Sequence, residues 1–485
     1  MGLLAVAGAA VVVPVKGIER FHYQRVDWKR CDIEAMDAAG GRCGVVSVPL
    51  NYADPDGRTL SIAVSRVRAT DPARRRGALL ANPGGPGASG VDTVDLLGDV
   101  LSPQVRAEYD LIGMDPRGVG GSGGRTCGWE TGEMIRSAGI GLDGFLTDTA
   151  RAARLAMRCL ATDPDELRQF TTRNTARDMD IVRRVLNEPA LSYYGVSYGT
   201  YLGAVFAQLF PDRVDRMVLD SAIDPQRYWT GLVRDWGAAD EAALDDWANW
   251  AAARDADHHL GSTAEQVRGT VENLTNTVAQ QSITIDGFVI DDHWLPFLLH
   301  NLLANYRLNE KMADTVAALV SMAGGQGASA PTPWLTDTLS ALRENENSSL
   351  AFITCGDDAA PENPADYWSE IEIRRAAQPV FGALAANIQP CAFWPRPVEP
   401  PTVVRNSVPA LIVQSTGDPR TPYQHAVSLH RAMPASRLVT LDGVRIHMTF
   451  RPDLSRCVLD TINTYLADGT RPPTDAQCLP DVANG

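Results

Sequence analysis

Short apolar runs that open into glycine-rich loops recur along this chain, and they limit its fold more than any other feature. Two such runs with their loops occupy residues 77–87 and 109–122, and two further runs that predict strands occupy 190–196 and 213–225. Apolar residues at helical spacing over 175–188 precede the third run. Strands that are apolar on both faces are typical of parallel sheets, whose successive strands are joined by crossover helices. We therefore predict an α/β fold with a mostly parallel sheet flanked by helices.

The segments around these runs fit the same fold. Residues 41–69 alternate apolar and polar positions around an Asp-Gly turn, which predicts two paired strands. We expect the helix over 175–188 to begin at an N-cap of Asn174 or Thr175. Further strands are predicted over residues 408–414 and 438–441, near the end of the chain.

Residues 226–400 do not continue this alternation of predicted strands and helices. They begin with a tryptophan-rich helical stretch and end in a proline-rich segment. We interpret them as a mainly helical cap inserted into the sheet. The expected organisation is therefore a signal-like or anchor segment over 1–20, the N-terminal part of the core over 21–225, the cap over 226–400, and the C-terminal part of the core over 401–485.

Ser197 stands between Gly195 and Gly199 at a predicted turn from strand to helix. The pattern G-x-S-x-G arises easily in a chain with 41 glycines, but a serine at such a turn is exposed at the top of a sheet. A serine hydroxyl becomes a nucleophile when a base takes its proton and an acid orients that base. Catalysis by Ser197 therefore requires an acid and then a histidine at later strand ends.

Asp418 and His447 occupy such positions, directly after the strands over 408–414 and 438–441. Asp220, at the end of an earlier strand, is the rival acid, but the later loop is better placed to meet His447. Asp115 is expected to fix a turn instead. The other histidines fit less well, since they lie in the cap, before the sheet or on a predicted surface helix: His22, His258, His259, His293, His300, His425 and His430.

The loop NPGGPGASG, over residues 82–90, is the predicted oxyanion site. Glycine lets the main chain approach closely enough for its N–H groups to stabilise an oxyanion. We expect Gly85 to donate one N–H group, with Gly84 as its neighbour, and Tyr198 to donate the second, because it follows the nucleophile directly. The alternative is an ordinary glycine-rich turn.

Charge and the first residues bear on partners and location. The formal net charge is −15 and no basic block is present, which argues against nucleic acid as a partner. Residues 2–15 are uncharged and apolar, which suits the apolar part of an export signal better than a transmembrane helix. A membrane tether through this segment and a buried first strand are the alternatives.

The eight cysteines form no C-x-x-C pattern and have no histidine at metal-binding spacing, which disfavours zinc. An even number of cysteines after a signal-like start indicates an oxidising compartment with up to four disulfides, whereas buried free thiols are the alternative. We predict that neighbours in the sequence pair with each other: Cys31 with Cys43, Cys127 with Cys159, Cys355 with Cys391, and Cys457 with Cys478.

The motifs PGGPGASG, DPRGVGGS, YYGVSYGTYLG and GDPRTP, followed by a late histidine, together resemble one known family. They are similar to those of the secreted tripeptidyl aminopeptidases among the prolyl-iminopeptidase-like serine peptidases, over most of the chain outside the cap. The resemblance implies an α/β-hydrolase core, a helical cap, no cofactor, and an exopeptidase that removes short peptides from free N-termini. By motif it assigns the nucleophile to Ser197, the acid to Asp418, the base to His447 and the oxyanion donors to the NPGGPG loop.

Two positions depart from that pattern, and both bear on the loops around the serine. The related prolyl iminopeptidases have histidine where this chain has Pro83, and the glycine that usually follows the catalytic histidine is Met448 here. The tail with Cys457 and Cys478 resembles the C-terminal segment of the family.

An exopeptidase of this kind needs an acid to hold the protonated amine of its substrate. Candidates in the cap are Asp235, Asp240, Glu241, Asp245, Asp246, Asp291 and Asp292. Packing explains the helical spacing of the cap tryptophans better than a substrate wall does: Trp229, Trp236, Trp247 and Trp250. A carboxylesterase or amidase acting on small acyl compounds with the same triad is the alternative enzyme, and an inactive hydrolase that only binds is a second alternative.

Overall fold

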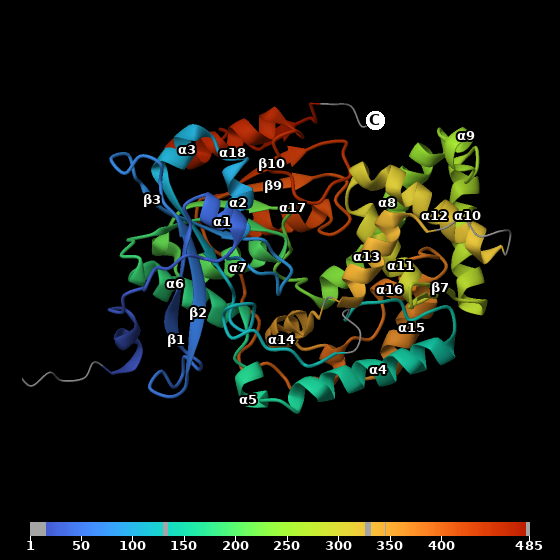
Figure 1. Ribbon diagram of the computed structural model, residues 1–485, viewed down its shortest axis with the longest axis horizontal. Coiled ribbons are helices and arrows are strands. Elements are labelled where there is room, and N and C mark those ends of the chain that lie inside the picture. The colour runs from blue at the N-terminus through green and yellow to red at the C-terminus, as the bar shows by residue number, and fades with distance from the viewer. Residues whose placement is uncertain (1–15, 130–133, 325–330, 345, 482–485) are drawn as a thin grey trace, which may run out of the picture.

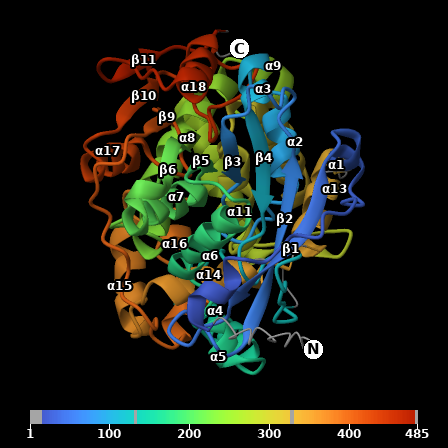
Figure 2. The same ribbon diagram turned by 90° about the vertical axis from the view of Figure 1, so that its left-hand side faces the viewer.

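The computed structural model describes residues 16–129, 134–324, 331–344 and 346–481. Within them, nine strands form one sheet in the order β1-β2-β4-β3-β5-β6-β9-β10-β11 (Figure 2). Their bounds are β1 Arg42–Pro49, β2 Thr59–Val67, β3 Gly77–Asn82, β4 Tyr109–Met114, β5 Leu191–Val196, β6 Val214–Asp220, β9 Leu411–Ser415, β10 Arg437–Leu441 and β11 Ala476–Cys478. The pairings β1 with β2 and β2 with β4 are antiparallel, and all others in this sheet are parallel. The predicted α/β fold is confirmed.

Helices cover both faces of the sheet because its strands are apolar on both sides. In β3, Leu79 and Ala81 pack toward the helices α2 Thr93–Gly98, α3 Pro103–Glu108 and α18 Arg456–Asp468. The intervening Leu80 packs toward the other face, which carries α6 Thr172–Val185, α7 Tyr198–Leu209 and α17 Tyr423–Ala432. The sheet is thus buried between two helical layers (Figure 2).

The chain between β6 and β9 forms a mainly helical body beside the open end of the sheet (Figure 1). Its described residues include a short hairpin, β7 Ile283–Ile285 with β8 Phe288–Ile290. Its helices are α8 Thr230–Ala252, α9 Asp255–His258, α10 Ala264–Gln280, α11 Trp294–Leu303, α12 Asn309–Ala323, α13 Pro333–Glu344, α14 Ser348–Asp357, α15 Pro364–Arg374 and α16 Gly382–Ala385. We call this body the cap, in keeping with its position in the sequence.

A segment from the N-terminal part of the chain also packs on the cap. Helix α4, Leu142–Leu160, runs along the edge of the cap helices (Figure 1). Its Phe145 joins Tyr367 and Ile371 of α15 in a small apolar cluster. Part of the segment between β4 and β5 therefore packs on the cap rather than on the sheet.

The start of α6 differs from the prediction. The helix begins at Thr172, and Thr171 is the N-cap, whose hydroxyl accepts the N–H of Asn174. Thr175 lies inside the helix and donates its hydroxyl back to the carbonyl of Thr171. The periodicity of this segment could not predict where the helix begins. The N–H of Thr172 donates to Asp357, which belongs to the inserted cap body and is far away in the sequence.

All four predicted disulfides are present: Cys31–Cys43, Cys127–Cys159, Cys355–Cys391 and Cys457–Cys478. They indicate a protein that folds in an oxidising compartment. The predicted export segment lies mostly outside the described residues, which begin at 16. In the part of the chain that the structure describes, no helix is long and apolar enough to cross a membrane.

Candidate active site

Ser197 lies at the sharp turn between β5 and α7, as the motif predicts. Its backbone has φ 56° and ψ −120°, a conformation that L-residues rarely adopt, and its N–H donates to the carbonyl of Asp220 at 3.0 Å. A Cβ atom on Gly195 would lie 2.4 Å from the carbonyl oxygen of Gly199, so the turn can close this tightly only with glycine. The strained turn presents the serine side chain at the carboxyl end of the sheet.

Asp418 and His447 lie together at the ends of β9 and β10. The ring Nδ1 of His447 is 2.8 Å from Oδ2 of Asp418. The same oxygen accepts the hydroxyl of Thr421 at 2.8 Å, and Oδ1 accepts the N–H groups of Arg420 and Thr421 at 2.8 Å and 3.1 Å. Asp418 therefore carries hydrogen bonds on both carboxylate oxygens.

These contacts decide the charge of Asp418. Complete burial by itself would raise the pKa of this carboxyl, but the charge and hydrogen bond of His447 and the hydrogen bonds of Thr421 hold its pKa below the ordinary value. The carboxylate stays ionised and engages Nδ1 of His447. Nε2 is then the ring nitrogen that is left to act on a group in the cavity.

Asp220, the rival acid, has a different place. Its carboxylate accepts the N–H groups of Thr449 and Phe450, the hydroxyl of Thr449 and the hydroxyl of Tyr194. Within the described residues it makes no hydrogen bond to the ring of His447. Asp220 instead holds the loop that follows the histidine, where Met448 has φ 72°.

The NPGGPG loop packs directly against the serine turn. A Cβ atom on Gly84 would lie 2.5 Å from the carbonyl oxygen of Val196, and the Gly84 N–H donates to the Asn82 side chain at 3.0 Å. That N–H is therefore engaged, and Gly84 serves for close packing beside Gly85, the expected donor. Among the described residues, the N–H groups of Gly85 and Tyr198 have no acceptor.

Asp115 fixes the end of this loop, as predicted. Its Oδ1 accepts the hydroxyl of Ser89 and the N–H groups of Gly90 and Val91 at 2.7 to 3.1 Å. The oxyanion loop is thus held at one end by Asp115 and at the other by β3.

Ser197, His447 and Gly85 line one cavity of about 610 Å³. The cap closes it with Trp229, the N-cap of α8, with Leu232 and Trp236 from α8, with Phe297 and Asn301 from α11, and with residues before and in α14. Trp229 and Trp236 thus form part of a wall, although both are buried. Trp247 packs fully inside the cap and donates its indole N–H to the carbonyl of Asn309.

None of the seven cap acids predicted to hold an amine lines this cavity. Several of them are engaged elsewhere: Asp235 with Arg227, Asp240 with His300, Glu241 and Asp245 with Arg268, and Asp246 with Arg445. His425 likewise is not at the surface as predicted, since it is 3% exposed and contacts Asp235.

Among the described residues, the acid that lines the cavity is Glu346, in the turn before α14. Its carboxylate accepts the N–H groups of Cys127 and Trp129 and the N–H and hydroxyl of Ser348, all of them neutral donors. Sequence reasoning missed it because it lies in a polar stretch, ENENSS, that has no periodicity or motif.

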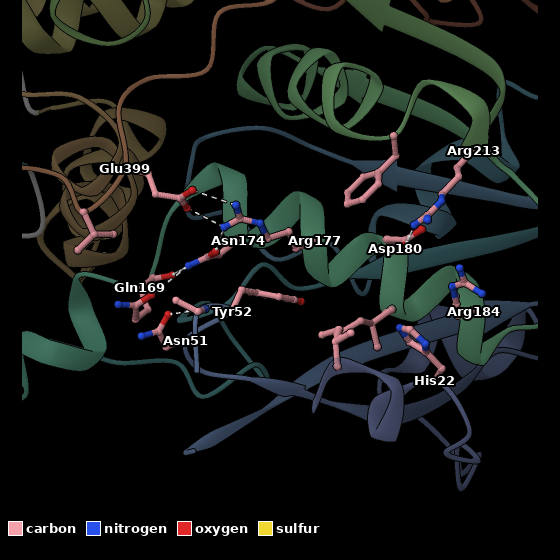
Figure 3. Close-up of a pocket in the computed structure, with 15 residues that line it drawn as sticks. His22, Asn51, Tyr52, Gln169, Asn174, Arg177, Asp180, Arg184, Arg213 and Glu399 are labelled. Carbon is pink, nitrogen blue, oxygen red and sulfur yellow. Dashed lines mark hydrogen bonds and ion pairs between the residues drawn. The ribbon is translucent and has the colours of Figure 1, made fainter. Parts of the chain in front are cut away.

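A slightly larger cavity, of about 670 Å³, lies along the outer side of α6 (Figure 3). Two of its arginines are paired within its own walls, Arg177 with Glu399 and Arg213 with Asp180. It contains none of Ser197, Asp418 or His447. We therefore take the smaller cavity as the candidate active site, because the serine and the histidine both line it.

Comparisons with known proteins agree with this geometry. The family model of TAP-like proteins matches residues 378–478. The tripeptidyl aminopeptidase of Streptomyces lividans is 35% identical, over 94% of this chain and 87% of its own. In Mycobacterium tuberculosis, serine protease Hip1 is 28% identical over 94% of this chain and 91% of its own, and carboxylesterase B is 29% identical over 98% and 92%. Identity at this level over nearly the whole chain makes this protein a member of the tripeptidyl aminopeptidase family of α/β hydrolases.

Proposed function

We propose that this protein is a serine exopeptidase that releases short peptides from the free N-terminus of its substrates. The observation that carries the proposal is one cavity that combines a serine on a strained turn, a histidine hydrogen-bonded to a buried carboxylate, and a second carboxylate whose hydrogen bonds within the described residues come from neutral donors. The family membership supports the same reading.

In the proposed mechanism, Nε2 of His447 takes the hydroxyl proton of Ser197 as the serine oxygen attacks the scissile carbonyl carbon. The developing oxyanion is stabilised by the N–H groups of Gly85 and Tyr198. His447 then gives its proton to the leaving amine, and the C–N bond breaks. Water repeats the cycle on the acyl-enzyme, and Asp418 holds the tautomer of His447 throughout.

Glu346 is proposed to bind the protonated α-amine of the substrate. Its hydrogen bonds to N–H and hydroxyl groups orient the carboxylate without cancelling its charge. An ammonium in the cavity therefore gains a charge-assisted hydrogen bond that an acetylated amine cannot form. This contact is what would make the enzyme an exopeptidase.

The test compares a tripeptide anilide with a free amine and the same compound acetylated. We expect cleavage of the free form only, abolished in Ser197→Ala. Glu346→Gln should lower kcat/KM for the free form about 10- to 100-fold, the value of one charge-assisted hydrogen bond. Glu362→Gln, which changes a largely exposed acid, is the matched control. Equal cleavage of both forms by the wild type would contradict the exopeptidase reading.

A carboxylesterase is the second candidate function. The relative named carboxylesterase B is 29% identical over 98% of this chain, and most cavity walls are apolar. The chemistry at the serine is shared between the two functions, so the substrate decides between them. Turnover of short-chain acyl esters that exceeds turnover of free-amine peptides would favour the esterase.

We further propose that the protein acts outside the cytoplasm, either secreted or tethered to the membrane through its N-terminal segment. The four disulfides support an oxidising compartment. Fractionation of cells that express the full sequence tests this, since a cytoplasmic location with free thiols would contradict it.

A further inference from the structure

Met448, directly after His447, has a backbone conformation that glycine would adopt more easily. Its φ is 72°, in the left-handed region where a side chain is strained. Three consecutive N–H groups are fixed here by acceptors in other elements, at 2.9 to 3.0 Å: His447 by the carbonyl of Ala304, Met448 by the hydroxyl of Ser221, and Thr449 by the carboxylate of Asp220. The surrounding structure therefore determines this backbone and holds a methionine in it.

The side chain of Met448 forms part of the wall of the active-site cavity. It is half-buried and packs against the apolar cluster that contains Ile446 and Phe450. A half-buried side chain gains only part of the hydrophobic stabilisation of a core residue, so packing alone is a weak reason to place methionine in a strained conformation. Apolar atoms of a ligand in the cavity would bury more of this side chain.

The order of the strands places Met448 on one side of Ser197. Strand β5, which leads to Ser197, lies between β3, which leads to the oxyanion loop, and β6, which leads to Ser221 (Figure 2). Because Met448 donates its N–H to Ser221, it lies on the side of the serine away from the oxyanion loop. In the proposed mechanism the carbonyl oxygen of the substrate points to that loop, and the leaving nitrogen faces His447. The leaving fragment therefore extends toward Met448.

The N-terminal part of the substrate is assigned to the opposite wall. The turn that holds Glu346 leads into α14, which packs on the oxyanion loop so closely that a Cβ atom on Gly87 would lie 2.5 Å from the hydroxyl oxygen of Ser349. A substrate whose amine is bound by Glu346 thus has its first residues beside α14. Its leaving residue then lies on the Met448 side of the serine.

The wall beside Met448 suits an apolar side chain. Ala304 borders the histidine, and Phe297, two turns earlier on the same side of the chain, also lines the cavity. The polar side chain between them, Asn301, accepts a guanidinium nitrogen of Arg420 at 2.5 Å and is therefore engaged. Methionine is flexible and polarisable, so it can adapt to apolar groups of different shape.

We propose that Met448 forms an apolar subsite for the first residue of the leaving fragment, so that the enzyme prefers peptides with an apolar side chain directly after the scissile bond. This inference rests on the proposed exopeptidase function. It makes Met448 a specificity-determining residue, which contacts the substrate but takes no part in the proton transfers.

The experiment uses free-amine tetrapeptide amides that share their first three residues and end in either leucine or glycine. We expect kcat/KM for release of the tripeptide to be at least about tenfold higher with leucine, because its side chain is buried in the subsite. In Met448→Gly, which adopts the same φ without strain, the ratio of leucine to glycine should fall at least about fivefold. Met448→Leu should keep the ratio within about twofold, since it restores an apolar side chain.

Met157→Ala is the matched control, because it removes a methionine that is 69% exposed on α4. Its ratio should equal that of the wild type. A general disturbance of His447 in Met448→Gly would lower kcat/KM for both peptides equally and leave the ratio unchanged, so the ratio separates a specificity role from a structural one.

Three results would overturn the inference: a wild-type ratio near one, a ratio that survives in Met448→Gly, or a ratio lost equally in Met157→Ala. If Met448→Gly does not fold, Met448→Gln keeps the length of the side chain but makes it polar, and an unchanged ratio in that variant would also contradict the inference. Wild-type hydrolysis of the peptide that ends in glycine tests the proposed function separately, because that leaving residue has no side chain.

Discussion

The replacement Asp418→Asn gives the sharpest test of the proposed triad. Oδ1 of Asp418 faces two fixed backbone donors, the N–H groups of Arg420 and Thr421, while Oδ2 faces side-chain groups only: Nδ1 of His447, the hydroxyl of Thr421 and, at 3.2 Å, the amide nitrogen of Gln414. The oxygen of an asparagine must therefore take the Oδ1 place, which leaves its NH₂ group facing His447. The imidazole would then accept on Nδ1 and carry its proton on Nε2, where it cannot take the proton of Ser197.

The expected loss in kcat is about 10⁴-fold, since the same tautomer error costs about that much in other serine hydrolases. At about 1.36 kcal/mol for each factor of ten, this corresponds to about 5.4 kcal/mol of transition-state stabilisation. The fold should persist, because the hydroxyl of Thr421 can turn to accept the new NH₂ group and the amide nitrogen of Gln414, which loses Oδ2 as an acceptor, still donates to the carbonyl of Thr421. The assay is kcat and KM on the free-amine tripeptide anilide, with the thermal unfolding midpoint measured in parallel.

Asp220→Asn is the matched control, because Asp220 is also a fully buried acid at a strand end. It holds Thr449 and Phe450 rather than the ring of His447. We expect a loss of about 1–3 kcal/mol in stability from the broken hydrogen bonds and a change in kcat of less than about tenfold. The reasoning would be refuted by an Asp418→Asn enzyme within tenfold of the wild type, or by a larger loss of kcat in Asp220→Asn with an unchanged unfolding midpoint.

Three further predictions concern stability. Burial raises the pKa of Asp357 to about 7, so between about pH 4 and 7 the folded state holds a proton that the unfolded chain has lost. The free energy of unfolding should therefore fall as pH rises through this window, by at most roughly 4 kcal/mol. Asp357→Asn should remove most of this pH dependence, which is checked by comparing Tm at pH 5 and pH 8. An equal change of Tm with pH in the variant would contradict the attribution of the pH dependence to Asp357. Gly84→Ala should reduce both activity and Tm, because its Cβ would meet the Val196 carbonyl at 2.5 Å and its φ is 98°; wild-type kcat and Tm would refute the packing argument. Replacing Cys355 and Cys391 by alanine should cost about 4 kcal/mol of unfolding free energy for a loop with a separation of 36 residues, measured by denaturant titration, and a loss below 1 kcal/mol would speak against a stabilising disulfide.

The mostly parallel sheet of the core and the place of Ser197 at a turn from strand to helix were predictable because both depend on local patterns. A short apolar run, a glycine-containing turn and then apolar residues at helical spacing can be recognised in the sequence without knowing which other elements pack against the segment. The same locality explains why the neighbour pairing of the cysteines was predicted correctly, since each disulfide joins cysteines adjacent in the sequence order.

The start of α6 and the place of His425 were predicted wrongly for one physical reason. A hydrogen bond between the Thr172 N–H and Asp357 connects residues 185 positions apart, and His425 meets Asp235 across 190 positions. Neither contact can be predicted from the hydrophobic periodicity of the segment that makes it. The energy that decides these positions comes from partners that only folding brings near.

By itself, the sequence determined the class of fold, the nucleophile turn, and the order in which serine, acid and histidine follow one another, because these depend on spacing along the chain. Only the tertiary structure decided which acid lines the active-site cavity. Glu346 is held there through its contact with Cys127, which is 219 positions away. A charge is functional only where the fold leaves it exposed to a cavity, and that exposure depends on how the cap packs on the core.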